Sequence, residues 1–162
     1  MSFVTVFSFT GKYELSVTEE SMPKIQSYID RLSNEILNEL FGVELYNLWA
    51  GSELPIYTGL SSEFTFQDEC NKIWISKGIS DMLAGFIYFE YSRDAYTQQT
   101  IDGAQKNTGE NSVNSSFVMS NLHGRYADAL SSYETIQHYI KQNLLVYPEF
   151  NGVKKYPFIP FF

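Results

Sequence analysis

The strongest pattern in the sequence lies in residues 72–96, KIWISKGISDMLAGFIYFEYSRDAY. Apolar side chains recur there every three or four residues, which is the spacing of one face of an α-helix. The positions with this spacing are Ile75, Ile79, Met82, Leu83, Phe86 and Ile87. Tyr88, Phe89 and Tyr91 occupy the remaining sides, and a helix that is apolar nearly all round is normally buried all round. We therefore expect this segment to be the central helix of the domain, or a helix held between two protomers.

A second helix is predicted on the N-terminal side of this segment. It starts near Ser21, behind a capping oxygen and acidic residues, and Gly42 stops it. Its apolar stripe consists of Ile25, Ile29, Leu32, Ile36 and Leu40. A shorter helical piece at residues 43–50 either continues this helix after a kink or starts another.

A third long helix is predicted from Ser116 or Ser120 to Asn143. Its apolar positions keep helical spacing for more than five turns and include Leu122, Tyr126, Ala129, Leu130, Tyr133, Ile136, Ile140 and Leu144. The sequence therefore predicts a mainly α, bundle-like domain with three principal helices.

The N-terminal residues 1–18 are predicted to form a small β-hairpin arm. Residues 3–9 and 13–17 are rich in β-branched and aromatic side chains, and a Thr-Gly-Lys turn separates them. A lone hairpin is only marginally stable in water. We therefore expect the arm to pack on the helices or to pair with a strand of a neighbouring chain.

Two further segments differ in character from the helices. Residues 97–115 form a long polar loop, and loops of this length inside a compact domain are usually functional or mobile. Residues 153–162 form an extended tail with an apolar end, which must lie in a groove of its own domain or dock on a partner. The predicted organisation is a single helical domain at 1–152 followed by a docking tail at 153–162.

Composition excludes several functional classes. The chain has 162 residues, 17% of them aromatic, and a net charge of −8, so clustered basic side chains for gripping nucleic acid are not expected. With one cysteine, Cys70, neither an intramolecular disulfide nor a cysteine-rich zinc site is available. Apolar runs are too short for a membrane span, and the chain opens on no recognisable export signal. A protein made in a reducing compartment, with no membrane partner, is expected.

Templates for catalysis match poorly, and the chain is predicted not to be an enzyme. His123 and His138 lie too far apart along one helix to share a metal, and no catalytic, cofactor-binding or metal-binding residue is predicted. Glu90 falls on the apolar helix, where a carboxylate needs a partner, and Arg93 is suitably placed three residues on. We expect a local or an intersubunit ion pair there. An unfamiliar active site remains open if Glu90, Asp94 and His123 surround one pocket.

The order of the segments resembles a known class of proteins. A helix ending in LFGVELY (residues 40–46) is followed by a long aromatic helix with GISDMLAGFIYFEY (78–91) and by a polar loop. The last helix carries RYADA (125–129) and stops near Tyr147 and Pro148. This arrangement, over about residues 20–150, is similar to the head-to-tail connector (adaptor, or neck ring) proteins of tailed bacteriophages, including those of crAss-like phages.

The resemblance implies a structural role in a virion. Such a protomer is made in the cytoplasm of the host bacterium and joins other copies in a ring, commonly a dodecamer, beneath the portal protein. The ring extends the DNA channel at the neck, lets DNA pass without sequence-specific binding, and meets further neck or tail proteins. It requires no cofactor and no catalytic residue.

Two sets of contact residues follow from this reading. In the tail, the partner interface is predicted to consist of Tyr156, Phe158, Ile159, Phe161 and Phe162. In the polar loop, the residues predicted to face the channel or the next ring are Thr100, Asp102, Gly103, Lys106 and Asn111. The alternative function is a soluble acidic protein-binding module, of the inhibitor or immunity type, that caps a basic partner in a one-to-one complex.

Overall fold

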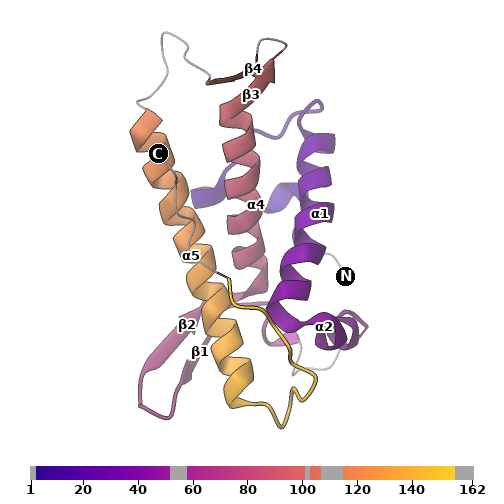
Figure 1. Ribbon diagram of the computed structural model, residues 1–162, viewed down its shortest axis with the longest axis vertical. Coiled ribbons are helices and arrows are strands. Elements are labelled where there is room, and N and C mark those ends of the chain that lie inside the picture. The colour runs from indigo at the N-terminus through magenta and orange to yellow at the C-terminus, as the bar shows by residue number, and fades with distance from the viewer. Residues whose placement is uncertain (1–2, 52–57, 101–102, 107–114, 156–162) are drawn as a thin grey trace.

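The computed structural model describes residues 3–51, 58–100, 103–106 and 115–155, and it gives the backbone alone for those that fall within 96–119. Three long helices stand side by side: α1 (Met22–Phe41), α4 (Gly78–Tyr96) and α5 (Ser115–Gln142). Helix α4 lies between the other two (Figure 1). The predicted mainly α fold with three principal helices is confirmed.

Helix α4 is the central helix, as its apolar sequence predicts. The side chains of Ile79, Met82, Leu83, Phe86, Ile87 and Phe89 are at most 2% exposed. Helices α1 and α5 and the segment around Tyr13 cover it within one chain. Gly85 permits a close approach of two of these elements, since a Cβ there would lie 2.8 Å from both Tyr13 Oη and Ala129 Cβ. Burial of this helix therefore requires no second protomer.

The start of α4 differs from the prediction. Residues Ile73–Ser76 form strand β2, and Gly78 begins the helix with φ of +87°. Ile75, which the helical spacing included, is an exposed strand residue. The backbone N–H of Ile79 donates to the carbonyl of Leu60 at 3.1 Å, so the first turn finds a partner in the preceding loop.

Helix α1 buries its predicted stripe, and Gly42 ends it. The backbone of Gly42 has φ of +82°, and helix α2 (Val43–Ala50) starts immediately afterwards in a new direction. Trp49 of α2 packs at 5.2 Å from the ring of Phe41 and at 4.2 Å from that of Phe3. The predicted second helical piece is therefore a separate helix held by aromatic contacts.

The predicted N-terminal β-hairpin is wrong. Short 3-10 turns form instead at η1 (Val6–Ser8) and η2 (Gly11–Tyr13), and no strand occurs within residues 3–21. The backbone N–H of Thr5 donates to Ser8 Oγ at 3.0 Å, a local bond that competes with strand pairing. The side chains of Val4, Val6, Phe9 and Tyr13 are buried against the bundle rather than in a sheet, whereas Phe7 is exposed.

Small antiparallel hairpins occur at two other places. Strands β1 (Phe64–Gln67) and β2 pair so that Phe66 lies opposite Trp74. Strands β3 (Thr97–Thr100) and β4 (Gly103–Lys106) pair within the segment predicted to be a polar loop. The loop prediction is thus wrong for residues 97–100 and 103–106. The predicted class of fold, helices with a small hairpin, holds with the hairpins relocated.

Residues 151–155 form a strap that runs back along the bundle. The backbone N–H groups of Asn151 and Val153 donate to the carbonyls of Phe41 (3.1 Å) and Glu39 (2.6 Å). The carbonyl of Val153 also accepts from Tyr133 Oη at 2.7 Å. The first residues of the predicted docking tail therefore belong to the bundle of their own chain.

Candidate interaction surface

Aromatic contacts attach the β1–β2 hairpin to α5. The ring of Phe66 lies 5.2 Å from that of Tyr139, and the ring of Trp74 lies 4.6 Å from that of His138. Phe64 contacts Tyr139 as well, at 5.3 Å. Because strand side chains alternate between the two faces, one face of the hairpin is committed to α5 and the other points away from it.

Asp68 organises the turn between the two strands. Its carboxylate accepts hydrogen bonds from Trp74 Nε1 (2.7 Å) and from the backbone N–H groups of Cys70 and Lys72 (both 2.9 Å). His138 Nε2 lies 3.7 Å away. The hydrogen bond from Trp74, followed by those from the backbone, lowers the pKa of Asp68 below its usual range.

We expect Trp74→Phe to raise the pKa of Asp68 toward its ordinary value. Because the pKa is lower in the folded chain, the ionised carboxylate stabilises the hairpin above about pH 4, and this contribution disappears as the pH falls. In the variant, the loss should begin at a higher pH, as measured by NMR titration of the Asp68 carboxyl carbon. Ile73→Val, on the opposite face, is the control and should leave the titration unchanged.

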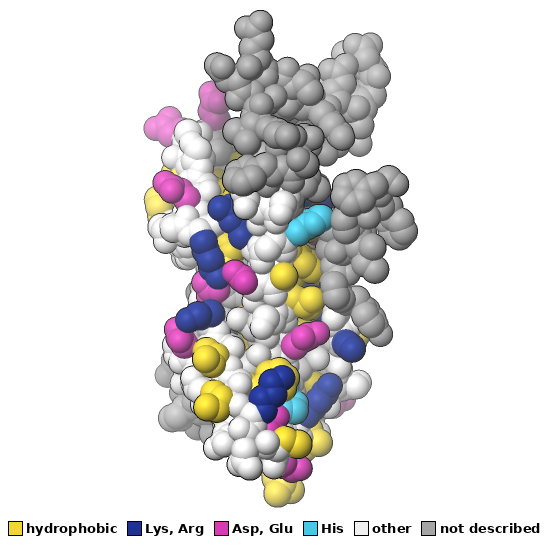
Figure 2. All heavy atoms as spheres, turned by 90° about the vertical axis from the view of Figure 1, so that its left-hand side faces the viewer, with side chains coloured by type: hydrophobic (Ala, Val, Ile, Leu, Met, Phe, Trp, Pro, Cys, Tyr) yellow, Lys and Arg dark blue, Asp and Glu magenta, His cyan; other side chains and the backbone are white. Residues whose placement is uncertain are grey.

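The outward face of the hairpin and the turn after α5 expose large aliphatic side chains. Ile73 and Ile75 are 64% and 55% exposed, opposite Gln67 and Thr65 in the strand register. Just past the end of α5, the exposed fractions are 49% for Leu144, 101% for Leu145 and 43% for Val146. We call these five residues the apolar hairpin end. Figure 2 shows several hydrophobic side chains on the lower part of the molecule, with charged side chains between them.

Two shallow hollows lie between the hairpin and the end of α5, and Tyr139 lines both of them. The first, of about 290 Å³, is lined in part by Phe64, Thr65 and Val146. The second, of about 410 Å³, is lined in part by Phe66, Asp68 and Gln142. Both are open to solvent and suit side chains of a protein partner better than a small molecule.

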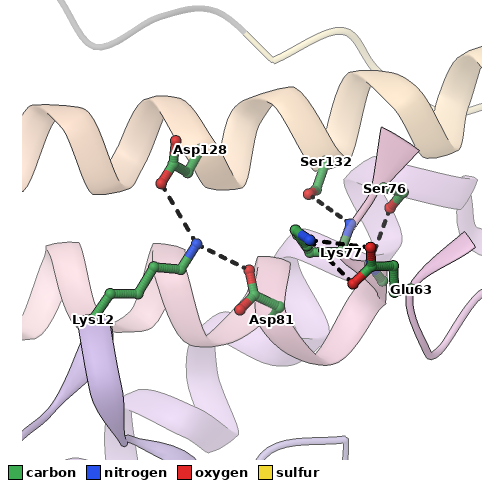
Figure 3. A network of polar contacts seen from close by, with 8 residues as sticks. Lys12, Glu63, Ser76, Lys77, Asp81, Asp128 and Ser132 are labelled. Carbon is green, nitrogen blue, oxygen red and sulfur yellow. Dashed lines mark hydrogen bonds and ion pairs between the residues drawn. The ribbon is translucent and has the colours of Figure 1, made fainter. Parts of the chain in front are cut away.

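Polar contacts elsewhere tie the elements of the bundle together. Lys12 Nζ lies 3.4 Å from Asp81 of α4 and 3.5 Å from Asp128 of α5. The backbone N–H of Lys77 donates to Ser132 Oγ at 3.3 Å (Figure 3). In the part of the chain that the structure describes, no three His, Cys, Asp or Glu side chains are grouped so as to hold a metal ion. We interpret this network as structural.

Glu90 and Arg93 form the predicted ion pair, and they do so within one chain. Their side chains approach to 2.5 Å, and Arg93 also contacts Asp94 at 3.0 Å. Tyr28 Oη donates to Asp94 at 2.7 Å; burial, and then this hydrogen bond, raises the pKa of Tyr28 to about 12. A contact of the pair with another subunit stays a prediction.

The residues named for an unfamiliar active site do not line either hollow. Glu90 and Asp94 are held by Arg93 and Tyr28, as described above, and His123 lies beside the ring of Phe89 at 6.4 Å. The two hollows are lined by other residues. The arrangement described here therefore adds no support to that alternative.

The predicted contact residues of the loop and tail are only partly within the structure. Thr100 of β3 lies opposite Gly103 of β4, and Lys106 ends β4. Asp102 and Asn111 lie outside the described residues, as does the whole predicted tail interface, Tyr156, Phe158, Ile159, Phe161 and Phe162. These roles stay predictions.

The apolar hairpin end does not follow from the helical pattern of the sequence. That pattern places Ile75 and Leu144 on buried helical stripes, whereas the structure exposes both. The signal that could have found the hairpin is the apolar–polar alternation in residues 64–67, FTFQ, together with the strand-forming residues 73–75, IWI, on the two sides of the turn residues 68–71. The sequence does not predict that Ile73 and Ile75 are exposed, because either face of a short strand can be the buried one.

Searches of protein-family models, curated proteins and solved structures find no match to this chain. Among the described residues, no helix combines the length and the hydropathy needed to cross a membrane. The class defined by the fold is therefore a helical domain with a small hairpin and an exposed apolar end.

Proposed function

We propose that this protein is a structural subunit of a phage virion neck, one of several copies that form a ring beneath the portal and join head to tail. The proposal starts from the resemblance over about residues 20–150. The observation that carries it is the apolar hairpin end, five large aliphatic side chains that one copy leaves in water. Single exposed apolar residues are ordinary, but a cluster at one end of a molecule is typical of an interaction surface.

Burial of this surface would favour assembly. Fully burying one isoleucine or leucine side chain contributes about 1.5 to 3 kcal/mol. Five partly exposed side chains thus offer several kcal/mol to an interface, and the flanking polar residues Thr65 and Gln67 supply a rim. A second copy or another neck protein would cover this surface.

The charge of the chain is compatible with a DNA channel. With a net charge of −8, a ring of copies repels phosphate groups rather than binding them, so DNA passes without sticking. The same charge also suits the alternative, an acidic module that caps one basic partner. The two proposals differ in stoichiometry.

Electron microscopy of the native assembly tests the proposed function. A cyclic ring of this chain in contact with a portal is the expected result. A one-to-one complex with a basic protein, with no ring, would contradict the neck role and support the acidic module instead.

The double variant Ile75→Asp/Leu145→Asp is expected to weaken assembly at least tenfold while the chain stays folded. Each substitution removes apolar surface and places a charge in the contact, and 1.4 kcal/mol already corresponds to about a factor of ten in affinity. Sedimentation velocity against concentration measures the association, and circular dichroism checks the fold. Phe7→Asp changes an apolar residue of η1 whose exposed fraction, 72%, lies between those of Ile75 and Leu145, and this variant should assemble normally. Equal weakening by both variants would count against the apolar hairpin end.

A further inference from the structure

We propose that the apolar hairpin end of one copy binds residues 156–162 of the next copy. This inference rests on the proposed function and names the contact that links neighbouring subunits. It requires that the surface be unoccupied by its own chain, that the segment be suited to it, and that the chain direct the segment toward a neighbour.

The surface is turned away from its own bundle. Trp74 packs on His138 of α5, so its neighbours Ile73 and Ile75 point to the opposite side of strand β2. The hollows beside Tyr139 lie on the α5-facing side of the hairpin, and Val146 lines the first of them. A segment that binds around the end of the hairpin would therefore meet aliphatic side chains on one side of it and space for rings on the other.

The proposed occupant has the matching chemistry. Residues 156–162, YPFIPFF, contain five large apolar side chains, two prolines and no charged side chain. Pro157 and Pro160 lack the N–H donor and are three positions apart, so they cannot both face away from the edge of a sheet. The segment is therefore expected to bind through its side chains, in the extended conformation that prolines favour, and not as an added strand.

The strap directs this segment away from the hairpin end of its own chain. Lys155 forms an ion pair with Glu39, and its Nζ lies 6.0 Å from the ring of Tyr133. Tyr133 precedes the last residue of α5, Gln142, by nine positions, which is about 14 Å along the helix. From Asn151 to Lys155 the chain thus moves away from the end that carries the surface (Figure 1).

Binding within one chain is unfavourable for this reason. Seven extended residues span about 22 Å. To reach the end of α5 in its own subunit, the chain would have to reverse direction at Lys155 and run back about 14 Å. Only the last residues would then reach Leu145, and the rest of the apolar segment would stay in water. A neighbouring copy accepts the whole segment with no reversal.

Such a contact joins two different surfaces of identical subunits. Heterologous contacts of this kind close into rings when the rotation between copies permits, and they otherwise grow into filaments. The proposed contact therefore accounts for a cyclic assembly built from one kind of interface.

Cysteine crosslinking of the full-length chain tests the proposal. Cys70 is exposed in the turn between β1 and β2, and it is the one cysteine of the sequence. Phe162→Cys adds a thiol to the proposed occupant, and a bismaleimide joins thiols that lie close together. We expect covalent dimers and higher multimers on a denaturing gel, and their loss when Cys70→Ser is added. Glu20→Cys, an exposed position before α1, is the matched control and should give no multimers.

The surface is tested in the same background. Adding Ile75→Asp to Phe162→Cys should reduce the multimers at least tenfold, whereas adding Phe7→Asp should leave them unchanged. Circular dichroism and labelling with a monofunctional maleimide verify that each variant is folded and that both thiols react.

Two results would overturn the inference. One is a crosslink within a single chain, which consumes both thiols with no increase in molecular mass. The other is the absence of a crosslink although both thiols react. Rings seen by electron microscopy without this crosslink would leave the proposed function standing and remove the tail contact. If the multimers crosslink as expected but the protein is absent from any portal complex, the tail contact stands and the proposed function is removed.

Discussion

Gly78→Ala is expected to lower the free energy of unfolding by about 3 to 5 kcal/mol. The backbone of Gly78 has φ of +87°, a region that costs a residue with a Cβ about 1 to 2 kcal/mol. The added Cβ would also lie 2.5 Å from the carbonyl carbon and oxygen of Ser62 and 2.6 Å from the oxygen of Ser61. All three are backbone atoms, which cannot move aside as a flexible side chain does.

The damage should spread to the first turn of the central helix. The loop that would have to shift also supplies the Leu60 carbonyl to Ile79, so α4 would lose a partner for its N-terminal N–H group. Thermal unfolding followed by circular dichroism measures the change, and a decrease in Tm of roughly 10 °C is expected for a chain of this size.

Gly124→Ala is the matched control for this prediction. Gly124 lies in α5, and a Cβ added there would have no neighbour within 4 Å, so alanine should stabilise the helix by up to about 1 kcal/mol. Were Gly78→Ala to unfold at nearly the same temperature as the unaltered protein, the described junction between β2 and α4 would be wrong.

Gly152→Ala is expected to release the strap and to destabilise the chain by a similar amount, about 3 to 5 kcal/mol. A Cβ on Gly152 would overlap the carbonyl oxygen of Leu40 and lie 2.7 Å from Gln137 Nε2. Gln137 is buried, and its amide donates to the carbonyls of Leu40 (3.1 Å) and Val153 (3.0 Å). Separating these groups deprives the buried Gln137 amide of its acceptors and the Leu40 carbonyl of this donor, at about 1 to 3 kcal/mol for each group left unsatisfied.

Hydrogen exchange distinguishes release of the strap from general loss of stability. In Gly152→Ala, the amide of Val153, which donates to Glu39, should lose protection before the amides of α4 do. Gly51→Ala serves as the control, because its Cβ would meet the nearest backbone oxygen, that of Asn47, at 3.6 Å, an ordinary contact. If Val153 keeps its protection in Gly152→Ala, the strap is not held as described.

If the further inference is correct, release of the strap should also impair the contact between copies. The strap sets the direction in which residues 156–162 leave the bundle, so Gly152→Ala combined with Phe162→Cys should give fewer multimers than Phe162→Cys alone. Stability and assembly would then be linked through Val153 and Lys155.

The long helices are predictable from the sequence because their periodicity is strong and local. The stripe from Ile25 to Leu40 and the apolar residues from Ile79 to Phe89 are buried as their spacing requires. Gly42 is recognisable as a stop because its positive φ suits glycine. The ion pair between Glu90 and Arg93 follows from helical geometry alone.

The strands are misplaced by the sequence pattern because strand propensity does not specify a partner. The N-terminal stretch has residues suited to a strand, but the bond from Thr5 to Ser8 and the positive φ of Gly11 turn it onto the bundle. Strands β1 and β2 pair instead, since Asp68 closes their turn and Phe66 and Trp74 find rings of α5 to pack against.

By itself, the sequence determined the helices, their buried faces, the acidic charge and the local ion pair, because each depends on residues within one or two helical turns. Only the tertiary structure decided that Ile73, Ile75 and Leu144 stay in water and that the strap lies between α1 and α5. Whether an apolar side chain is covered depends on which distant segments reach it. That is set by the packing of the whole chain, and no local pattern records it.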